Sequence, residues 1–286
     1  MSRQLGLFGL GLIGTSLARR LLDAGHSVVG FDPEQTSLDR LTQLGGAPTD
    51  PLGVWEASVV LAAVFDTEQL ATLIAQAPEN SDAILISTST CDPERMPALA
   101  KEASQKNITL IEAPLSGTSK DLADGKAVFL IAGDPDISNE LTWLWSVLGR
   151  AHHFVGEIGN GNRAKLAINL VLGLNRAALA EGLVFAKSIG LDPSDFLPLL
   201  QDTAAYSNVM PSKGPKMVNR DFAPLGRIVQ SAKDFALINA IGAANDQFLP
   251  FADTYSKMMQ LALEEGHSDL DNAAILLAIE AAKNRV

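Results

Sequence analysis

A glycine-rich turn near the start of the chain constrains the fold more than any other stretch. Gly9, Gly11 and Gly14 follow a short apolar segment at 5–8, and a run with helical character separates them from a second apolar segment that ends at Asp32. In this strand–turn–helix–strand context the first glycine allows the tight turn, the second lets the backbone approach a pyrophosphate, and the third lets the helix pack on the strand. The pattern predicts a dinucleotide site rather than a purely structural turn. We expect the pyrophosphate to lie against Gly9, Leu10, Gly11, Leu12, Ile13 and Gly14.

Asp32, at the end of the second predicted strand, favours NAD as the cofactor. A carboxylate at this place accepts hydrogen bonds from the ribose hydroxyls and repels a 2′-phosphate. The next residues are Pro33, Glu34 and Gln35, so no arginine that could pair with such a phosphate follows closely. The alternative is that Asp32 caps a helix over 34–44. The sequence thus predicts NAD, with NADP possible.

Predicted strands and helices alternate through the rest of the first half. Apolar strand-like runs lie at 58–64, 83–87, 109–112 and 128–132, and helical runs lie at 67–77, 93–106 and 137–148. Such alternation predicts a doubly wound, largely parallel sheet. Ligands of these sheets bind beyond the carboxyl ends of the strands. We therefore expect the residues that follow the strands to converge on one cleft: Val64, Phe65, Asp66, Ser89, Thr90 and the segment from Ala113 to Thr118.

Ser116, Gly117 and Thr118 form the candidate substrate loop. Two hydroxyls and a glycine amide make a neutral cradle that can hold a carboxylate by hydrogen bonds. The alternative is an ordinary turn that is rich in small residues, and spacing alone leaves both open.

The second half of the chain carries no strand signal. Helical runs are predicted at 161–189, 193–202, 230–244, 250–265 and 271–283, with a loop at 212–227. We predict two domains, an NAD(P)-binding domain at 1–160 and an all-α domain for substrate binding and oligomerisation at 161–286. The first helix is apolar nearly all round, so we expect it to be buried against other helices or a partner subunit.

The long predicted helix begins with the motif G-x-G-x-x-x-K-x-x-x-N, which runs from Gly159 to Asn169. Lys165 and Asn169 lie one helical turn apart on one face. Because the near neighbours of Lys165 are apolar, desolvation should lower the pKa of its ammonium toward the range that is useful for proton transfer. Lys165 is thus the candidate general acid and base. The alternative is a lysine whose stem is buried while its charge reaches solvent.

The composition of the chain restricts the classes of binding partner and the cellular compartment that we expect. The net charge of −11 and the lack of a basic run argue against nucleic acid. A single cysteine, Cys91, excludes an internal disulfide and fits a reducing compartment, so we expect a cytoplasmic protein. Asn169, Asn175 and Arg176 interrupt the long apolar helix and argue against a membrane span. The apolar surface of this helix indicates a homo-oligomer, either a dimer or a tetramer.

Five motifs follow one another along the chain: Gly9-x-Gly11-x-x-Gly14, Ser89-Thr90-x-x-Pro93, Ala113-Pro114-Leu115-Ser116-Gly117, Gly159-x-Gly161-x-x-x-Lys165-x-x-x-Asn169 and Lys233-Asp234. In this order they resemble those of the β-hydroxyacid dehydrogenases of the 3-hydroxyisobutyrate dehydrogenase and tartronate semialdehyde reductase type. The resemblance covers nearly the whole chain. It implies a Rossmann domain followed by an all-α domain built on a long interdomain helix. It also implies NAD(P)-dependent hydride transfer between nicotinamide and a small 3-hydroxy acid, or reduction of the corresponding semialdehyde.

The resemblance also implies functional roles for individual residues of this chain. Lys165 matches the family's catalytic lysine, and Asn169 matches its substrate-positioning asparagine. Ser116 and Gly117 match the substrate-binding loop. The positions that contact the nicotinamide half of the cofactor are matched by Thr90 and Lys233. From spacing alone, Lys233 and Asp234 would instead form a solvated surface pair.

Three departures from the family pattern bear on specificity. Thr118 stands where the family usually has a second glycine, which adds a methyl and a hydroxyl beside the substrate. Val64 and Phe65 replace the usual Leu-Pro in the wall near the cofactor. Glu112 is a conservative change of the usual acid before Ala113. The first two changes leave the chemistry in place and bear on which substrate fits.

Two alternative functions fit parts of the same pattern. One is an imine reductase of the same architecture, although related imine reductases generally carry a different residue at the position of Lys165. The other is a nucleotide-binding homologue that has lost catalysis, which the joint presence of Lys165, Asn169 and Ser116 disfavours. A comparison of activity on carbonyl and imine substrates distinguishes an imine reductase from a hydroxyacid dehydrogenase. Thermal stabilisation by NAD without any turnover would identify the nucleotide-binding homologue.

Overall fold

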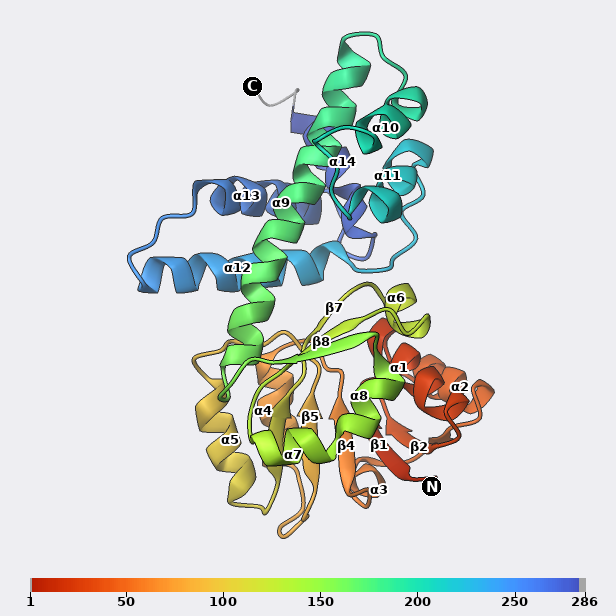
Figure 1. The fold of residues 1–286 in the computed structure, drawn as a ribbon, viewed down its shortest axis with the longest axis vertical. Coiled ribbons are helices and arrows are strands. Elements are labelled where there is room, and N and C mark those ends of the chain that lie inside the picture. Colours follow the sequence, from red (N-terminus) through yellow and green to blue (C-terminus); the bar gives the residue numbers. More distant parts are fainter. Residues whose placement is uncertain (1, 283–286) are drawn as a thin grey trace. The chain divides into compact units, whose positions relative to one another are not determined.

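A computed structural model describes residues 2–282 of the chain (Figure 1). The chain forms two compact units, Met1–Lys165 and Leu166–Val286. The long helix α9 (Asn160–Ser188) begins in the first unit and continues in the second. The boundary predicted after residue 160 falls at the start of this helix, whereas the division between the units falls within it.

The first unit is built on a six-stranded parallel sheet in the order β3-β2-β1-β4-β5-β6 (Figure 1). Its strands are β1 (Gln4–Phe8), β2 (Ser27–Phe31), β3 (Ala47–Pro48), β4 (Val59–Ala62), β5 (Ile84–Ser87) and β6 (Thr109–Glu112). The helices between them are α1 (Leu12–Asp23), α2 (Gln35–Gln43), α3 (Pro51–Val54), α4 (Thr67–Ala75) and α5 (Met96–Ser104). The strand order reverses between β1 and β4, the switch point where such sheets bind ligands. The predicted doubly wound parallel sheet is confirmed.

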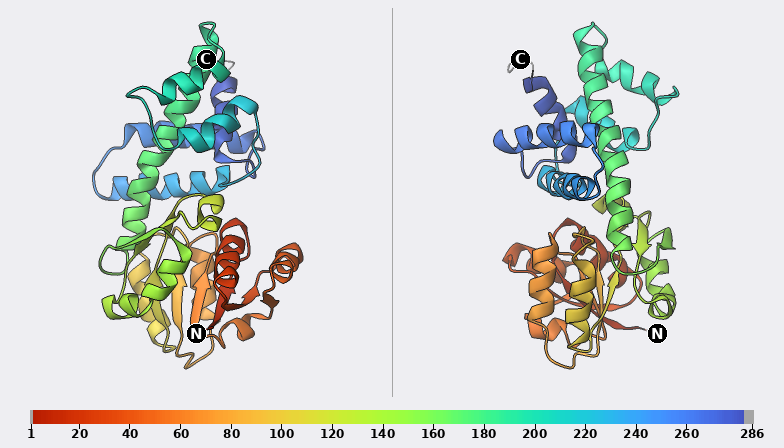
Figure 2. Two further views of the ribbon diagram at one scale, coloured as in Figure 1. Left: turned by 45° about the vertical axis from the view of Figure 1, so that its right-hand side comes forward. Right: turned by 90° about the vertical axis from the view of Figure 1, so that its left-hand side faces the viewer.

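Alternation along the strands builds a separate core on each face of this sheet. Leu5 and Leu7 of β1 are buried together with Leu17 of α1 on one face. Phe8 is buried on the other face, in a cluster with side chains of α4 and α5. Figure 2 shows α4 and α5 side by side on that face. Because both faces are covered, these strands read as continuous apolar runs rather than as alternating ones.

A second, three-stranded sheet follows in the order β7-β8-β9. It consists of β7 (Leu115–Ser116), β8 (Val128–Ile131) and β9 (Ala151–Phe154), with α6 (Ser119–Ala123), α7 (Pro135–Glu140) and α8 (Thr142–Leu148) between them. The predicted strand at 128–132 thus belongs to this sheet, where β8 pairs antiparallel with β7 and parallel with β9. The helix predicted over 137–148 is divided in two at Leu141.

The second unit is all-α, as predicted. Besides α9 it contains α10 (Pro193–Gln201), α11 (Met210–Asn219), α12 (Ile228–Ala244), α13 (Pro250–Glu264), a 3-10 turn η1 (Asn272–Ala274) and α14 (Ile275–Ala282). Its core gathers around Phe235, Tyr255 and Met259. Lys283, where the last helix was predicted to end, lies outside the described residues.

The prediction of a loop over 212–227 was wrong, because α11 occupies its first part. Pro211, Gly214 and Pro215 make the segment a poor helix former on propensity. Packing overrides that preference: a Cβ at Gly214 would lie 2.6 Å from the Leu197 side chain, so the glycine lets α11 approach α10 closely.

Helix α9 is long and apolar enough to cross a membrane by length and composition alone. The core helix of a soluble protein passes the same test. Helix α9 packs on other parts of the chain over some of its surface. It carries the buried charged side chains of Lys165 and Arg176. A Cβ at Gly173 would lie 2.5 Å from the Phe235 ring, so the glycine lets α12 pack directly on the α9 backbone.

Candidate active site

The turn between β1 and α1 has the backbone that a dinucleotide site requires. Gly9 has a φ of +81°, a left-handed conformation that favours glycine. A Cβ at Gly14 would lie 1.8 Å from the carbonyl oxygen of Gly9, so α1 can pack on the turn only without a side chain there. A Cβ at Gly11 would instead meet no atom within 4 Å. Open space therefore lies over the middle of the turn.

Helix α1 begins beside this space without a capping side chain. Its N-cap is Gly11, and no side chain among residues 2–282 caps it. The first N–H groups of a helix lack partners within the helix, and together with the helix dipole they attract an anion. The turn from Gly9 to Gly14 thus fits the pyrophosphate of a nicotinamide dinucleotide.

Asp32 is held at the end of β2 by two backbone donors. Its Oδ2 accepts the Leu10 N–H at 2.7 Å, and its Oδ1 accepts the Glu34 N–H at 2.9 Å. Helix α2 has Glu34 as its N-cap and no side-chain cap, so Asp32 does not cap this helix. Each carboxylate oxygen keeps a lone pair that can accept a ribose hydroxyl. The geometry suits the predicted cofactor role.

Val64, Phe65 and Thr90 follow β4 and β5 at the edge of the sheet that carries the glycine turn. Strands β1, β4 and β5 are parallel neighbours, so their carboxyl ends lie together. The Ser89 hydroxyl donates to the Val64 carbonyl at 2.7 Å and ties two of these strand ends to each other. The Phe65 N–H donates to the Gln69 side chain at 2.8 Å. The structure thus brings these predicted cofactor residues to the same edge.

The predicted substrate loop consists of the end of β7 and the start of α6. Gly117 has a φ of +137° and is exposed, and Ser116 is half-buried. The Thr118 hydroxyl donates to Asp121 at 2.7 Å and accepts the Asp121 N–H, so it caps α6. While it donates to Asp121 it cannot donate to a ligand. The Ser116 hydroxyl is therefore the better donor for a substrate carboxylate.

A buried carboxylate holds the start of α9. Glu112, the last residue of β6, is fully buried and accepts the N–H groups of Gly159 and Asn162 as well as the Asn162 side-chain amide. Asn162 in turn accepts the Cys91 N–H at 2.7 Å. Burial raises the pKa of the Glu112 carboxyl, and these hydrogen bonds offset part of the rise. A negative charge near a helix N-terminus is favourable, so Glu112 anchors the helix that carries Lys165.

Lys165 lies in the second turn of α9 with an exposed fraction of only 9%. Four residues later, Asn169 donates from Nδ2 to Oδ2 of Asp234 on α12 at 2.7 Å. The Lys233 ammonium lies 3.2 Å from the other oxygen of Asp234. The side chains of Lys233 and Asp234 are 18% and 12% exposed, so they are not a solvated surface pair. One carboxylate thus orients two of the predicted site residues.

Three residues hold the site in ways that the sequence analysis did not predict: Glu112, Asn162 and Asp234. Asp234 had a signal, since it follows Lys233 directly and an acid beside a functional lysine can orient it. Glu112 had a signal in its match to the acid that the family usually has before Ala113, but Asn162 had none, because it lies far from Glu112 in the chain and nothing local links them. Their pairing follows only from the fold.

Two family models match the chain one after the other. The NAD binding domain of 6-phosphogluconate dehydrogenase matches residues 4–156. The domain described as NAD-binding of NADP-dependent 3-hydroxyisobutyrate dehydrogenase matches residues 159–279. The first match covers the glycine turn and both sheets, and the second covers α9 and nearly all of the helices that follow.

Relatives of similar length match across both units. Glyoxylate/succinic semialdehyde reductase 2, chloroplastic, of Arabidopsis thaliana is 26% identical over 98% of this chain and 80% of its own length. The 2-hydroxy-3-oxopropionate reductase of Escherichia coli strain K12 is 28% identical over 98% of each chain. Among solved structures, 3-hydroxyisobutyrate dehydrogenase of Mycobacterium tuberculosis with L-serine has a TM-score of 0.83 at 24% identity, covering 98% of this chain and 100% of that one. The structural match shows a shared fold.

Proposed function

Because the chain belongs to the β-hydroxyacid dehydrogenase family of NAD(P)-dependent oxidoreductases, we propose that Lys165 passes the proton while a hydride moves between the nicotinamide and a small 3-hydroxy acid. In the opposite direction the same site would reduce the corresponding semialdehyde. The observation that carries this proposal is the placement of a buried lysine one turn before an asparagine that a carboxylate holds in position.

We assign a separate role in this reaction to each of the site residues. Neutral Lys165 accepts the hydroxyl proton during oxidation, and its ammonium donates the proton during reduction, assistance that is typically worth about 10²–10⁴-fold. Nδ2 of Asn169 gives one hydrogen to Asp234 and has a second that it can donate to the substrate oxygen. The Ser116 hydroxyl and the Gly117 N–H would hold the substrate carboxylate. When bound, the nicotinamide supplies the hydride chemistry.

A substrate panel tests this function. Purified protein is incubated with 3-hydroxy acids and NAD or NADP, and with semialdehydes and the reduced cofactors, while the absorbance of reduced nicotinamide is followed. We expect turnover of at least one small 3-hydroxy acid or its semialdehyde. Cyclic imines in the same assay test the imine reductase alternative, and turnover of imines alone would contradict the proposal.

We further propose that the protein prefers NAD to NADP, because the Asp32 carboxylate lies where it would repel a 2′-phosphate. Asp32→Asn removes the charge and leaves the size of the side chain nearly unchanged. We expect the ratio of kcat/KM for NAD to that for NADP to fall by about tenfold, the value of one charged hydrogen bond. Glu34→Gln, two residues away, is the matched control and should leave the ratio unchanged. A wild-type protein that prefers NADP would refute the assignment.

We also propose that the protein is a homodimer or homotetramer assembled through exposed apolar residues of α9. Val171 and Phe185 are 60% and 62% exposed, and apolar surface of this kind on a long helix seldom faces water. Light scattering after gel filtration should give a multiple of the 30.3 kDa chain mass. Phe185→Glu should shift that mass toward the monomer. A wild-type mass of a single chain would rule out the assembly.

A further inference from the structure

Arg176 of α9 is a buried guanidinium that pairs with no carboxylate of residues 2–282. Its side chain is only 5% exposed. Nη2 donates to the Tyr255 hydroxyl and, at 3.3 Å, to the Ser231 hydroxyl. Among the residues that the structure describes, Nε is buried and has no acceptor, and no acidic group forms an ion pair with Arg176. Among the described residues, its positive charge is therefore met by two neutral hydroxyls and by the Tyr255 ring, whose centroid lies 5.8 Å from Cζ, and by no carboxylate.

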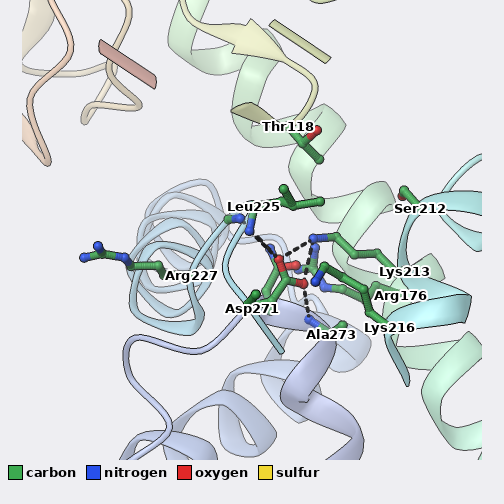
Figure 3. Close-up of polar contacts among 12 residues, drawn as sticks. Thr118, Arg176, Ser212, Lys213, Lys216, Leu225, Arg227, Asp271 and Ala273 are labelled. Atoms are coloured by element: carbon green, nitrogen blue, oxygen red, sulfur yellow. Dashed lines mark hydrogen bonds and ion pairs between the residues drawn. The ribbon is translucent and has the colours of Figure 1, made fainter. Parts of the chain in front are cut away.

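A second buried cation belongs to the same cluster (Figure 3). Lys213 of α11 is 3% exposed, and its Nζ lies 2.7 Å and 2.9 Å from the two oxygens of Asp271. Burial lowers the pKa of Lys213 to about 8, although Asp271 opposes the change, and the positive charge of Arg176 contributes to the decrease. Figure 3 shows both side chains in this one cluster, where their like charges repel each other.

Asp271 has no free lone pair that could accept a hydrogen bond from the Arg176 guanidinium. Besides Lys213 it accepts the Leu225 N–H at 2.8 Å and the Ala273 N–H at 3.0 Å, with Gly226 at 3.3 Å (Figure 3). A carboxylate offers about four lone pairs, and these contacts use them. Within the part of the chain that the structure describes, the cluster therefore holds two buried cations against one carboxylate, a net charge of +1 in a place of low dielectric constant.

An unpaired buried charge is costly, whereas a paired and hydrogen-bonded one is tolerated. An oxyanion accepts charge-assisted hydrogen bonds from both a guanidinium and an ammonium, and it would neutralise the excess charge of the cluster. We propose that Arg176 and Lys213 form an oxyanion-binding site inside the helical unit, which takes a carboxylate or phosphate group of a small molecule. Arg176 supplies its charge and the Nε–H that has no acceptor among the described residues, and Lys213 supplies the second charge.

Two sources could provide this oxyanion. It could be a free anion, or it could be a second acid group of the substrate, an identification that rests on the proposed function. Arg176 follows Asn169 by seven residues on the same face of α9, which places their Cα atoms about 10.5 Å apart along the helix. Both residues contact α12: Arg176 donates to Ser231, and Asn169 donates to Asp234 three residues further along that helix.

Anion binding to the whole chain, without cofactor, tests the site directly. The melting temperature is measured with increasing inorganic phosphate or malonate, and sodium chloride of equal ionic strength corrects for screening. We expect both anions to stabilise the wild-type protein beyond the chloride control. Arg176→Met should raise the apparent dissociation constant by about tenfold or more. Arg220→Met removes a charge from the same unit at the exposed pair with Glu280, and it should bind as the wild type does.

Arg176→Lys serves as a second variant if the methionine variant does not fold. It keeps the charge but loses the Nε–H, and it should still weaken anion binding severalfold. A wild-type protein that neither anion stabilises beyond chloride would overturn the proposal, as would an Arg176→Met variant that binds as tightly as the wild type.

The source of the oxyanion can be identified from the kinetics of two 3-hydroxy acids, one with and one without a second acid group. For a 3-hydroxy acid with a second carboxylate or phosphate, Arg176→Met should raise KM by about tenfold, while a 3-hydroxy acid without one keeps its KM. Unchanged KM values for both, together with lost anion binding, would assign the site to a free anion. If no hydroxy acid is turned over at all, the proposed function fails while the binding measurement still decides the anion site.

Discussion

Lys165→Met is expected to reduce kcat for the 3-hydroxy acid by about 10²–10⁴-fold, the usual contribution of a positioned acid or base. Methionine keeps the length and apolar stem of the side chain, so the buried position on α9 stays filled. The glycine turn and Asp32 belong to other segments of the first unit and are unchanged. The dissociation constant for NAD, measured by calorimetry, should therefore remain that of the wild type.

Lys187→Met is the matched control for this variant. Lys187 lies in the last turn of the same helix and is exposed, so its loss should leave kcat unchanged. A Lys165→Met variant that retains half of the wild-type rate would contradict the role of the lysine. A variant that loses NAD binding together with activity would also contradict it, because the lysine would then serve cofactor binding or the fold.

Asp271→Asn should produce the largest loss of stability. The aspartate is fully buried and holds Lys213 and several backbone N–H groups (Figure 3). Breaking a buried ion pair by removing one partner typically costs about 3–5 kcal/mol, because the other charge stays buried. We expect the free energy of unfolding, measured with urea, to fall by about that amount. An exposed neighbour provides the control: Asp269 pairs with Arg227 at the surface, and Asp269→Asn should change stability by less than about 0.5 kcal/mol.

The same residue gives a pH dependence. Burial alone would raise the pKa of Asp271, but the Lys213 charge and the backbone hydrogen bonds outweigh it, and the pKa is lowered. A lowered folded-state pKa contributes stability that is complete above the unfolded value of about 3.9 and is lost as the pH falls through the folded value. Acid unfolding of Asp271→Asn should lack this contribution. If the variant and the wild type lose stability in parallel as the pH falls, Asp271 is not the group that titrates.

The glycine turn shows what the sequence could predict and why. Its chemistry is local: Gly9 needs a left-handed φ, Gly14 needs to lack a Cβ, and Asp32 follows at the end of the next strand. Spacing along the chain encodes each of these requirements. The same holds for Lys165 and Asn169, whose separation on a helix fixes their common face. Residues at strand ends were also predictable, because parallel strands bring their carboxyl ends together.

Contacts between distant segments were not predictable from one sequence. Glu112 anchors α9 only because β6 ends beside Gly159 and Asn162. Helix α11 forms despite its prolines because Gly214 fits against Leu197. From the sequence, Arg176 is only a charged residue that interrupts an apolar helix. Its burial and its partners depend on α11 and α12, which pack around it in the fold. Local propensity is a weak guide where tertiary packing decides.

The most direct test of the account follows the transferred hydrogen itself. The 3-hydroxy acid that the protein oxidises fastest is prepared with deuterium on the carbon that bears the hydroxyl group and is supplied with NAD. The mass of the reduced nicotinamide is then measured. We expect one deuterium in each reduced cofactor, because the hydride passes directly between the two carbons while Lys165 takes only the hydroxyl proton. Reduced cofactor without deuterium, or no reduced cofactor from any 3-hydroxy acid, would contradict the account.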